Sequence, residues 1–240
     1  MGVRVLDLYC GAGGAAKGFD VDGNTIVGVD IAPQPNYPYE FIQADACDFP
    51  LDGFDIVHAS PPCQGHTTMR GLHLRYDTAD MLVHTIRRLR ESSVPTWSVE
   101  NVMGVTYPYD HDFVMCGASF GCITRDGTKL YMARHRKFWT NLPLSIPKCM
   151  CSFYRSGGWR CAGVYGTSVG NMREGGVEWK AWKADREQSK TLMGIEWMTR
   201  SDLIEAIPPV YTRHIYRQWQ GMDLWRSSHD RPNDVQSLHS

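Results

Sequence analysis

Short apolar runs that alternate with helical patterns are the feature that most constrains the fold of this chain. The runs cover residues 3–9, 25–30, 40–43, 54–59 and 95–99. A short helix is expected at 15–19, and residues 80–90 have the apolar spacing of an amphipathic helix. Alternation of this kind predicts an α/β fold with a doubly wound, mostly parallel sheet. Ligands of such sheets bind beyond the carboxyl ends of the strands, where polar residues follow the runs here.

The second half of the chain is less regular. Gly, Trp, Arg and Ser dominate residues 152–182, which indicates an irregular subdomain or a long functional loop. Helices are expected over 177–193, from Ser201 as an N-cap, and over 210–220. The polar residues from Gly221 on predict a flexible tail.

Composition narrows the class of protein. The 240 residues allow one large domain, or one domain with a small appendage. The formal net charge of -1 gives no global basic field for nucleic acid, although a local basic groove is compatible with it. No run of about 18 apolar residues occurs, so no membrane span is expected. Eight cysteines without a secretory signal favour reduced thiols and a cytoplasmic location.

The ends of the first three runs form a pattern that suits a nucleoside. The glycine cluster at 11–14 lies between a strand and a helix, where the backbone admits a ligand closely. It is not a phosphate loop, because Lys17 is misplaced for one. Asp30 can bind two ribose hydroxyls, and Asp45 can accept a hydrogen bond from an adenine amino group. The alternative for either acid is an exposed loop carboxylate without a ligand.

The fourth run ends in the turn Ser60-Pro61-Pro62-Cys63-Gln64. Two prolines stop the strand and fix the backbone, and Cys63 follows them directly. A thiol on a rigid turn at a strand end is well placed to act as a nucleophile. The alternative is a loop cysteine without a role.

Six segments of the first 140 residues match one set of family motifs in order. They are 7–14, 27–31, 61–64, 100–102, 116–121 and 134–136. These segments resemble the DNA cytosine-5 methyltransferase family, most of all its small phage-type members. The resemblance implies a Rossmann-like methyltransferase fold with S-adenosylmethionine as cofactor. It also implies methyl transfer to carbon 5 of cytosine in double-stranded DNA.

The resemblance assigns residues to three roles. The catalytic residues would be Cys63, Glu100, Arg134 and Arg136. The cofactor-binding residues would be Asp7, Tyr9, Gly11, Gly13, Gly14, Asp30, Ile31, Asp45, Ala46 and Pro62, and the substrate-binding residues Gln64 and Asn101.

The chemistry of cytosine agrees with these roles. A Cys63 thiolate would add to carbon 6 of a base flipped out of the duplex. Glu100 would share its proton with ring nitrogen N3 in a desolvated pocket, as charge builds there. Arg134 and Arg136 alternate along an expected strand and so would share one face, either supporting the base or merely solvated.

Three other functions stay open at this point. The same reaction on RNA fits the motifs, as in tRNA-methylating relatives. A non-catalytic nucleic-acid-binding relative would keep the pocket without the activity. Amino-methyltransferases also use a Ser-Pro-Pro core, but they place an aromatic residue where Cys63 stands.

The resemblance also divides the chain. We expect a catalytic cofactor-binding domain (1–140), a short target-recognition region (141–190), helices that return to the catalytic domain (191–220) and a tail (221–240). The short recognition region predicts a short or relaxed target sequence. Residues 206–211 resemble the last family motif without its Gly-Asn start, so no cofactor contacts are assigned to them. A monomer in the cytoplasm of a bacterium or of a phage-infected host is expected.

The cysteines of the second half raise the question of zinc. Cys149, Cys151 and Cys161 would need His135 or Cys122 as a fourth ligand. Cys-x-Cys is not the usual zinc spacing and no second paired motif completes it, so no metal site is predicted. The remaining cysteines are interpreted as small apolar or loop residues; they are Cys10, Cys47, Cys116 and Cys122.

Overall fold

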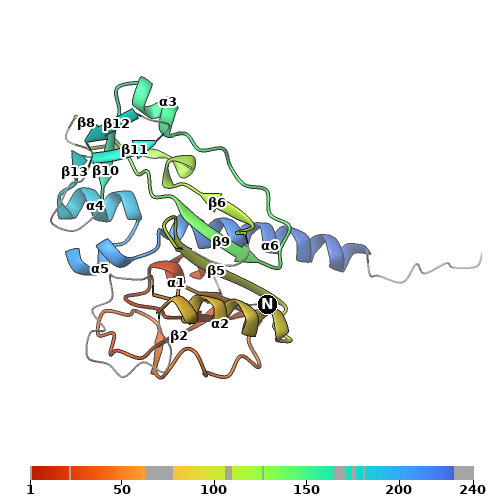
Figure 1. The fold of residues 1–240 in the computed structure, drawn as a ribbon. Helices are drawn as coiled ribbons and strands as arrows, with labels where there is room; N and C mark the ends of the chain where they lie inside the picture. The colour runs from red at the N-terminus through yellow and green to blue at the C-terminus, as the bar shows by residue number, and fades with distance from the viewer. Residues whose placement is uncertain are drawn as a thin grey trace, which may run out of the picture.

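The computed structural model describes residues 2–21, 23–62, 78–105, 110–125, 127–164, 171–174, 177–180 and 182–229 (Figure 1). The main sheet consists of β1 (Arg4–Leu8), β2 (Thr25–Asp30), β3 (Glu40–Gln43), β4 (Ile56–Ala59), β5 (Thr96–Val102), β6 (Phe113–Met115) and β9 (Arg136–Thr140). Its helices are α1 (Gly14–Phe19), α2 (Thr78–Glu91) and α6 (Pro209–His229).

Smaller elements form the rest of the described chain. They are the 3-10 turn η1 (Gly117–Phe120), β7 (Cys122–Arg125), β8 (Thr128–Tyr131), α3 (Cys151–Ser156), β10 (Arg160–Gly163), β11 (Asn171–Glu174), β12 (Val177–Lys180), β13 (Trp182–Lys183), α4 (Arg186–Met193) and α5 (Arg200–Glu205). None of the helices in the described segments has the length and apolar character needed to cross a membrane.

The strand order of the main sheet is that of a doubly wound fold. Within the described residues it runs β3-β2-β1-β4-β5-β9-β6. Strands β1 to β5 are parallel, and β9 is antiparallel to both β5 and β6. The order reverses beside β1, which places a ligand crevice at the carboxyl ends of β1 and β4. The predicted α/β fold class is confirmed.

The side chains of β1 point alternately to the two faces of the sheet, and each face carries apolar residues of this strand. Val5 packs in one cluster with Phe19 of α1 and Tyr216 of α6. Leu6 points to the other face and packs in a cluster with Ile86 of α2. Helices therefore cover the sheet on both sides, as they do around a buried parallel sheet.

A smaller sheet lies above the main sheet in the view of Figure 1, together with α3. Its order is β13-β10-β8-β7, and β11 pairs with β12 as a separate two-stranded sheet. Strands β7 and β8 come from residues 122–131, so this sheet combines segments from either side of residue 140. The domain boundaries given above stay a prediction.

The expected single helix over 177–193 is wrong. Residues 177–180 form β12, which pairs antiparallel with β11, and α4 begins only at Arg186. Residues 177–180 make hydrogen bonds to β11 in place of the hydrogen bonds of a helix. Helix α4 then begins after Asp185, which forms a capping box with Gln188. Its carboxylate accepts a hydrogen bond from the Gln188 N–H at 2.7 Å, and the Gln188 side chain accepts one from the Asp185 N–H at 3.2 Å.

Two other helix limits differ from the sequence prediction. Thr199, not Ser201, caps α5, because its hydroxyl accepts from the Asp202 N–H and the Asp202 carboxylate accepts from the Thr199 N–H. Helix α6 continues to His229, so residues 221–229 are helical where a flexible tail was expected. Residues 230–240 lie outside the described chain.

Candidate active site

The register of the sheet brings the predicted site residues to one edge. Leu8 lies opposite Val29 and Ala59, and Ala59 lies opposite Val99. The residues that follow these positions are Tyr9, Asp30, Ser60 and Glu100. The glycine turn after β1, the acid that ends β2 and the proline turn after β4 are therefore neighbours.

Asp30 is held against the glycine turn. Its Oδ2 accepts a hydrogen bond from the Gly11 N–H at 3.1 Å, and its Oδ1 accepts one from the Ala32 N–H at 3.0 Å. The side chain is only 7% exposed. A carboxylate has about four acceptor positions, so each oxygen keeps capacity for a further hydroxyl donor.

The predicted cofactor-binding glycines differ in what surrounds them. Gly11 and Gly13 have positive φ angles of 48° and 88°, which favour glycine. A Cβ at Gly11 would meet nothing within 4 Å, whereas one at Gly13 would lie 3.1 Å from Tyr37. At Gly14 it would lie 2.6 Å from the Ile207 carbonyl oxygen. The space beside the turn is therefore at Gly11, and the other two glycines permit close packing.

Asp7 is buried under this turn. Neither carboxyl oxygen has a well-aligned hydrogen-bond partner in the part of the chain that the structure describes. Burial raises the pKa of Asp7 well above its ordinary value; the nearby Ala16 N–H offsets part of that rise, and the charge of Asp30 adds to it. Two buried carboxyl groups with spare acceptor capacity suit a ligand rich in hydroxyl and amino donors.

Tyr9 forms the wall between the turn and α2. Its φ of 58° is a strained value for a side chain of this size, at a cost on the order of 1–3 kcal/mol. The hydroxyl contacts Thr85 Oγ1 at 2.8 Å and Cys47 Sγ at 3.4 Å. These contacts tie the Tyr9 side chain to α2 and to the segment that follows β3.

The segment that follows β3 closes this end of the crevice. Asp45 Oδ1 accepts from the Cys47 N–H at 2.9 Å, and the buried Ala46 offers its carbonyl to Arg88. Ile31 is half-buried beyond Asp30, and its carbonyl accepts a hydrogen bond from Gln43. The residues predicted to bind the cofactor, from Asp7 to Ala46, follow or end the neighbouring strands β1, β2 and β3, and their role in binding stays a prediction.

Asn101 fixes the proline turn after β4. Its Nδ2 donates to the Pro61 carbonyl at 2.9 Å, and its Oδ1 accepts from the Val102 N–H at 2.8 Å. With 2% of its surface exposed, Asn101 holds the turn in place, and its direct contact with substrate stays a prediction. Pro62 is half-buried at the end of this turn. Cys63 and Gln64 follow it and lie outside the described residues.

Glu100 and Arg136 form a shielded ion pair beside this turn. Arg136 Nε lies 2.7 Å from Glu100 Oε1, and 5% of Glu100 is exposed. Arg136 can reach Glu100 because β9 pairs antiparallel with β5, with Arg136 opposite Val102. Burial raises the pKa of Glu100, and the charges of Arg136 and Arg134 offset only part of this rise.

The sequence analysis expected Arg134 and Arg136 to share one face of a strand. The structure differs, because only Arg136 belongs to β9. Arg134 precedes β9, and its guanidinium donates to the carbonyls of Val164, Leu203 and Ile204. Only 2% of its surface is exposed. The carbonyls at the end of α5 attract the cation and draw Arg134 away from the line of the strand. Arg136 forms the ion pair with Glu100, and Arg134 acts on Glu100 through its charge.

Sequence reasoning missed the contacts of the C-terminal segment with the glycine turn. Trp197 Nε1 donates to the Ala12 carbonyl at 3.0 Å, and Thr212 Oγ1 donates to the Ala15 carbonyl at 2.7 Å. Ile207 packs against Gly14. Residues 206–211 lack the Gly-Asn start of the family motif, but their Pro-Pro and aromatic pattern is a signal that points to these contacts.

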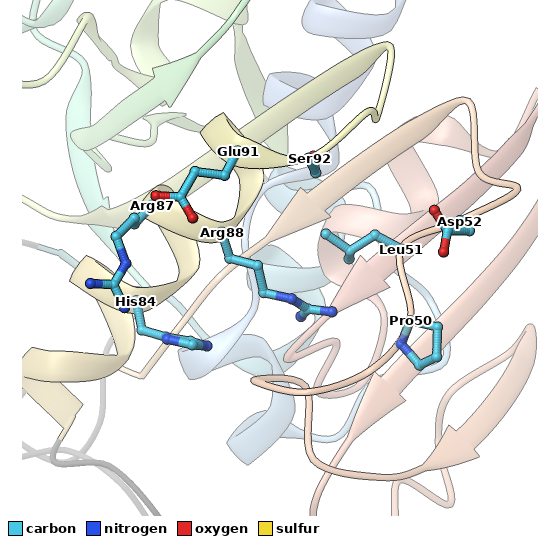
Figure 2. Close-up of a pocket in the computed structure, with 8 residues that line it drawn as sticks. All are labelled: Pro50, Leu51, Asp52, His84, Arg87, Arg88, Glu91 and Ser92. Carbon is cyan, nitrogen blue, oxygen red and sulfur yellow. The ribbon is translucent and has the colours of Figure 1, made fainter.

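A shallow hollow of about 410 Å³ lies away from this edge (Figure 2). Its lining comes from the second half of α2, including His84, Arg87 and Glu91, and from residues 50–52. Residues 50–52 precede β4 and α2 ends just before β5, so the hollow faces the amino ends of these strands. None of its lining residues is a predicted site residue, although Arg88 among them donates to the carbonyl of Ala46.

The fold and the crevice define the class of protein to which this chain is similar. A doubly wound sheet with a glycine turn after β1 and an acid at the end of β2 is a Rossmann-like fold. No protein-family model matches the sequence, and no curated protein does.

Solved structures give the particular likenesses. S. pombe Dnmt2 methyltransferase matches with a TM-score of 0.53 and 14% identity, over 93% of this chain and 100% of that one. A putative DNA modification methyltransferase encoded within an E. coli prophage matches with a TM-score of 0.42 and 18% identity, over 77% of this chain and 61% of that one. This chain thus spans about three fifths of the prophage protein.

An RNA methyltransferase from Salinibacter ruber also matches, with a TM-score of 0.32 and 15% identity, over 61% of this chain and 87% of that one. The match to the S. pombe protein supports a similarity of fold. At 14% sequence identity, this match shows the fold and nothing further. The other two likenesses are too distant to carry an argument.

Proposed function

We propose that this protein transfers a methyl group from S-adenosylmethionine to carbon 5 of cytosine in double-stranded DNA. The reaction would pass through a covalent bond between Cys63 and a flipped-out base. The protein would act as a monomer, in the cytoplasm of a bacterium or of a phage-infected host.

The observation that carries the proposal is the buried Glu100 beside the proline turn. Burial raises the pKa of Glu100, so its carboxyl keeps a proton to a higher pH than an exposed glutamate does. A proton offered to N3 of cytosine makes carbon 6 more electrophilic. Arg136 Nε, 2.7 Å from Glu100 Oε1, keeps a positive charge beside this carboxyl.

The crevice between the glycine turn and Asp45 supports S-adenosylmethionine as the cofactor. Asp30 has acceptor capacity for ribose hydroxyls, Gly11 leaves open space beside the turn, and Asp45 stands at the far end. When bound, S-adenosylmethionine would supply the electrophilic methyl group that carbon 5 takes.

The chain's own groups would carry the other steps. The Cys63 thiolate would form a bond to carbon 6, and negative charge would move toward N3, where Glu100 donates its proton. After methylation, water would take the proton from carbon 5, the electron pair left behind would form the carbon 5–carbon 6 double bond, and Cys63 would leave as a thiolate while the N3 proton returns to Glu100. Asn101 would position Cys63 indirectly through the Pro61 carbonyl.

Covalent trapping tests this proposal. A duplex oligonucleotide with 5-fluorocytosine, incubated with the protein and S-adenosylmethionine, should give a stable adduct that survives denaturation. Cys63→Ala should give no adduct and still bind the cofactor. An adduct on an RNA oligonucleotide alone would move the substrate to RNA, and absence of any adduct would favour a non-catalytic binder.

Glu100→Gln tests the role of the proton. Removing a general acid of this kind should lower the methylation rate by about 100-fold or more. Glu187→Gln is the matched control, because that exposed glutamate in α4 pairs only loosely with Lys190 at 3.5 Å. Equal rates for the two variants would remove Glu100 from the mechanism.

A further inference from the structure

Four sulfur and nitrogen ligands gather where the main sheet meets the smaller sheet. They belong to Cys116, His135, Cys149 and Cys151, and their ligand atoms all lie within 4.8 Å of one another. Cys116 and Cys151 are buried, His135 is half-buried and Cys149 is exposed. No carboxylate belongs to this group, so every donor is a thiol or an imidazole.

Two distances within the group are close to those between ligands around one metal ion. Cys116 Sγ lies 3.4 Å from Cys151 Sγ, and Cys149 Sγ lies 3.4 Å from His135 Nε2. Cys151 also interacts with His135 and with Cys149, and Cys149 with Cys116. Around a tetrahedral zinc ion with bonds of about 2.3 Å to sulfur and 2.0–2.1 Å to nitrogen, neighbouring ligands are about 3.5–3.8 Å apart.

Three separate segments supply the four ligands. Cys116 directly follows β6, and His135 directly precedes β9. Cys149 and Cys151 lie before and at the start of α3. Because β6 and β9 pair in the main sheet while α3 packs on β10, the group bridges the two sheets.

We propose that Cys116, His135, Cys149 and Cys151 bind one zinc ion as a structural Cys₃His site. Thiolate and imidazole ligands in a compact tetrahedral group favour zinc over hard cations, which take oxygen ligands. Four protein ligands leave no open coordination position, so the ion serves the fold and not the chemistry. The exposed Cys149 gives the ion a way in.

The ion would tie α3 to the edge of the main sheet beside the candidate active site. His135 is adjacent in the chain to Arg136, which pairs with Glu100. Its carbonyl also accepts a hydrogen bond from Arg136 Nη1 at 2.9 Å. A metal on His135 would therefore fix the start of β9 and the guanidinium that follows it.

Apolar packing alone does not account for the group. Cys161 belongs to the same hydrophobic cluster as Cys116 and Cys151, yet it is not among the four converging ligands. A disulfide between Cys116 and Cys151 would need sulfur atoms about 2.05 Å apart. The observed separation is 3.4 Å.

Metal analysis of the full chain tests the site independently of methyl transfer. Protein expressed in zinc-containing medium and purified without chelator should hold about one zinc ion per chain by elemental mass spectrometry. Substitution with Co²⁺ should give the absorption bands of a tetrahedral thiolate complex. A strong chelator should lower the thermal midpoint by at least about 5 °C.

Single substitutions locate the ion. Cys149→Ser should lose most of the zinc, and since Cys149 is exposed, the change costs little packing. Cys161→Ala is the buried control and Cys122→Ser the half-buried one; both should keep the metal. Protein without zinc that does not take it up, zinc lost equally in the controls, or a Cys116–Cys151 disulfide in peptide mass spectra would overturn the proposal.

Discussion

Buried ionisable groups at the sheet edge set how stability depends on pH. Asp7 and Glu100 have raised pKa values because burial disfavours their charged forms. Their contribution to stability is present below the ordinary carboxyl pKa and is lost as pH rises through the raised one. His58 acts in the opposite direction, because burial lowers its pKa to about 3.

His58 should make the protein sensitive to acid. Its two ring nitrogens contact Ser98 Oγ at 2.8 Å and Ser60 Oγ at 3.0 Å, and it is fully buried. As pH falls below about 6.5 the unfolded chain takes up a proton on this histidine, while the folded chain does not until about pH 3. The loss of unfolding free energy should approach about 1.4 kcal/mol per pH unit.

Urea unfolding between about pH 7 and pH 4 measures this slope. His58→Gln should start less stable but lose less unfolding free energy across the window, since glutamine does not titrate. Asp7 and Glu100 are common to both proteins, so their opposite contribution cancels in the comparison. Parallel curves for the two proteins would contradict the assignment.

At the scale of elements, small residues let α1 and α6 approach each other. A Cβ at Gly18 would lie 1.8 Å from Thr212 Oγ1 and 2.4 Å from the Pro209 carbonyl oxygen. Thr212 in turn donates to the Ala15 carbonyl. This contact attaches the C-terminal helix beneath the glycine turn.

Gly18→Ala should therefore destabilise the fold. Alanine in a helix is favoured over glycine by about 0.5–1 kcal/mol. Overpacking costs about 1–3 kcal/mol, so the clash should win. Denaturant unfolding checks the sign. Gly104→Ala is the control, because a Cβ there would meet nothing within 4 Å, and its effect should stay within about 0.5 kcal/mol.

Arg134 and Arg136 should separate stability from activity. Arg134 holds the carbonyls at the end of α5, and the single ammonium of a lysine cannot reproduce its fork of donors. Arg134→Lys should lower the free energy of unfolding by about 2 kcal/mol. Arg136→Lys should change the free energy of unfolding little, because the positive charge beside Glu100 remains. Its main effect should be slower methylation.

Unfolding curves and methylation rates of the two lysine variants check this assignment. If Arg134→Lys kept its stability and lost only activity, Arg134 would act at the base, as the sequence alone had predicted.

At the scale of the whole molecule, the predicted target-recognition region (141–190) is short. The smaller sheet and α3 lie beside the carboxyl edge of the main sheet and offer few elements for reading a long sequence (Figure 1). We therefore expect methylation at a short or relaxed target. Bisulfite sequencing of DNA from cells that express the protein would show it, with Cys63→Ala cells as the background. One long, strictly defined target would contradict the expectation.

The parallel half of the fold was predictable from local patterns. Local patterns located β1 to β5, with β2 and β3 at the predicted residues. The buried parallel strands are continuous apolar segments, whereas β3 is partly exposed and has polar residues at both ends. The irregular half was not. Residues 177–193 carry helix-compatible spacing, and long-range pairing of β12 with β11 overrode it.

The amino-acid sequence by itself determined which residues follow each strand, and therefore that Asp30, Ser60 and Glu100 meet at one sheet edge. That outcome needs only strand direction and register, which local apolar patterns specify. Only the tertiary structure decided that Arg136 pairs with Glu100, and that Cys116 joins His135, Cys149 and Cys151. Contacts between residues far apart in the chain depend on how whole elements pack, and no local pattern encodes that.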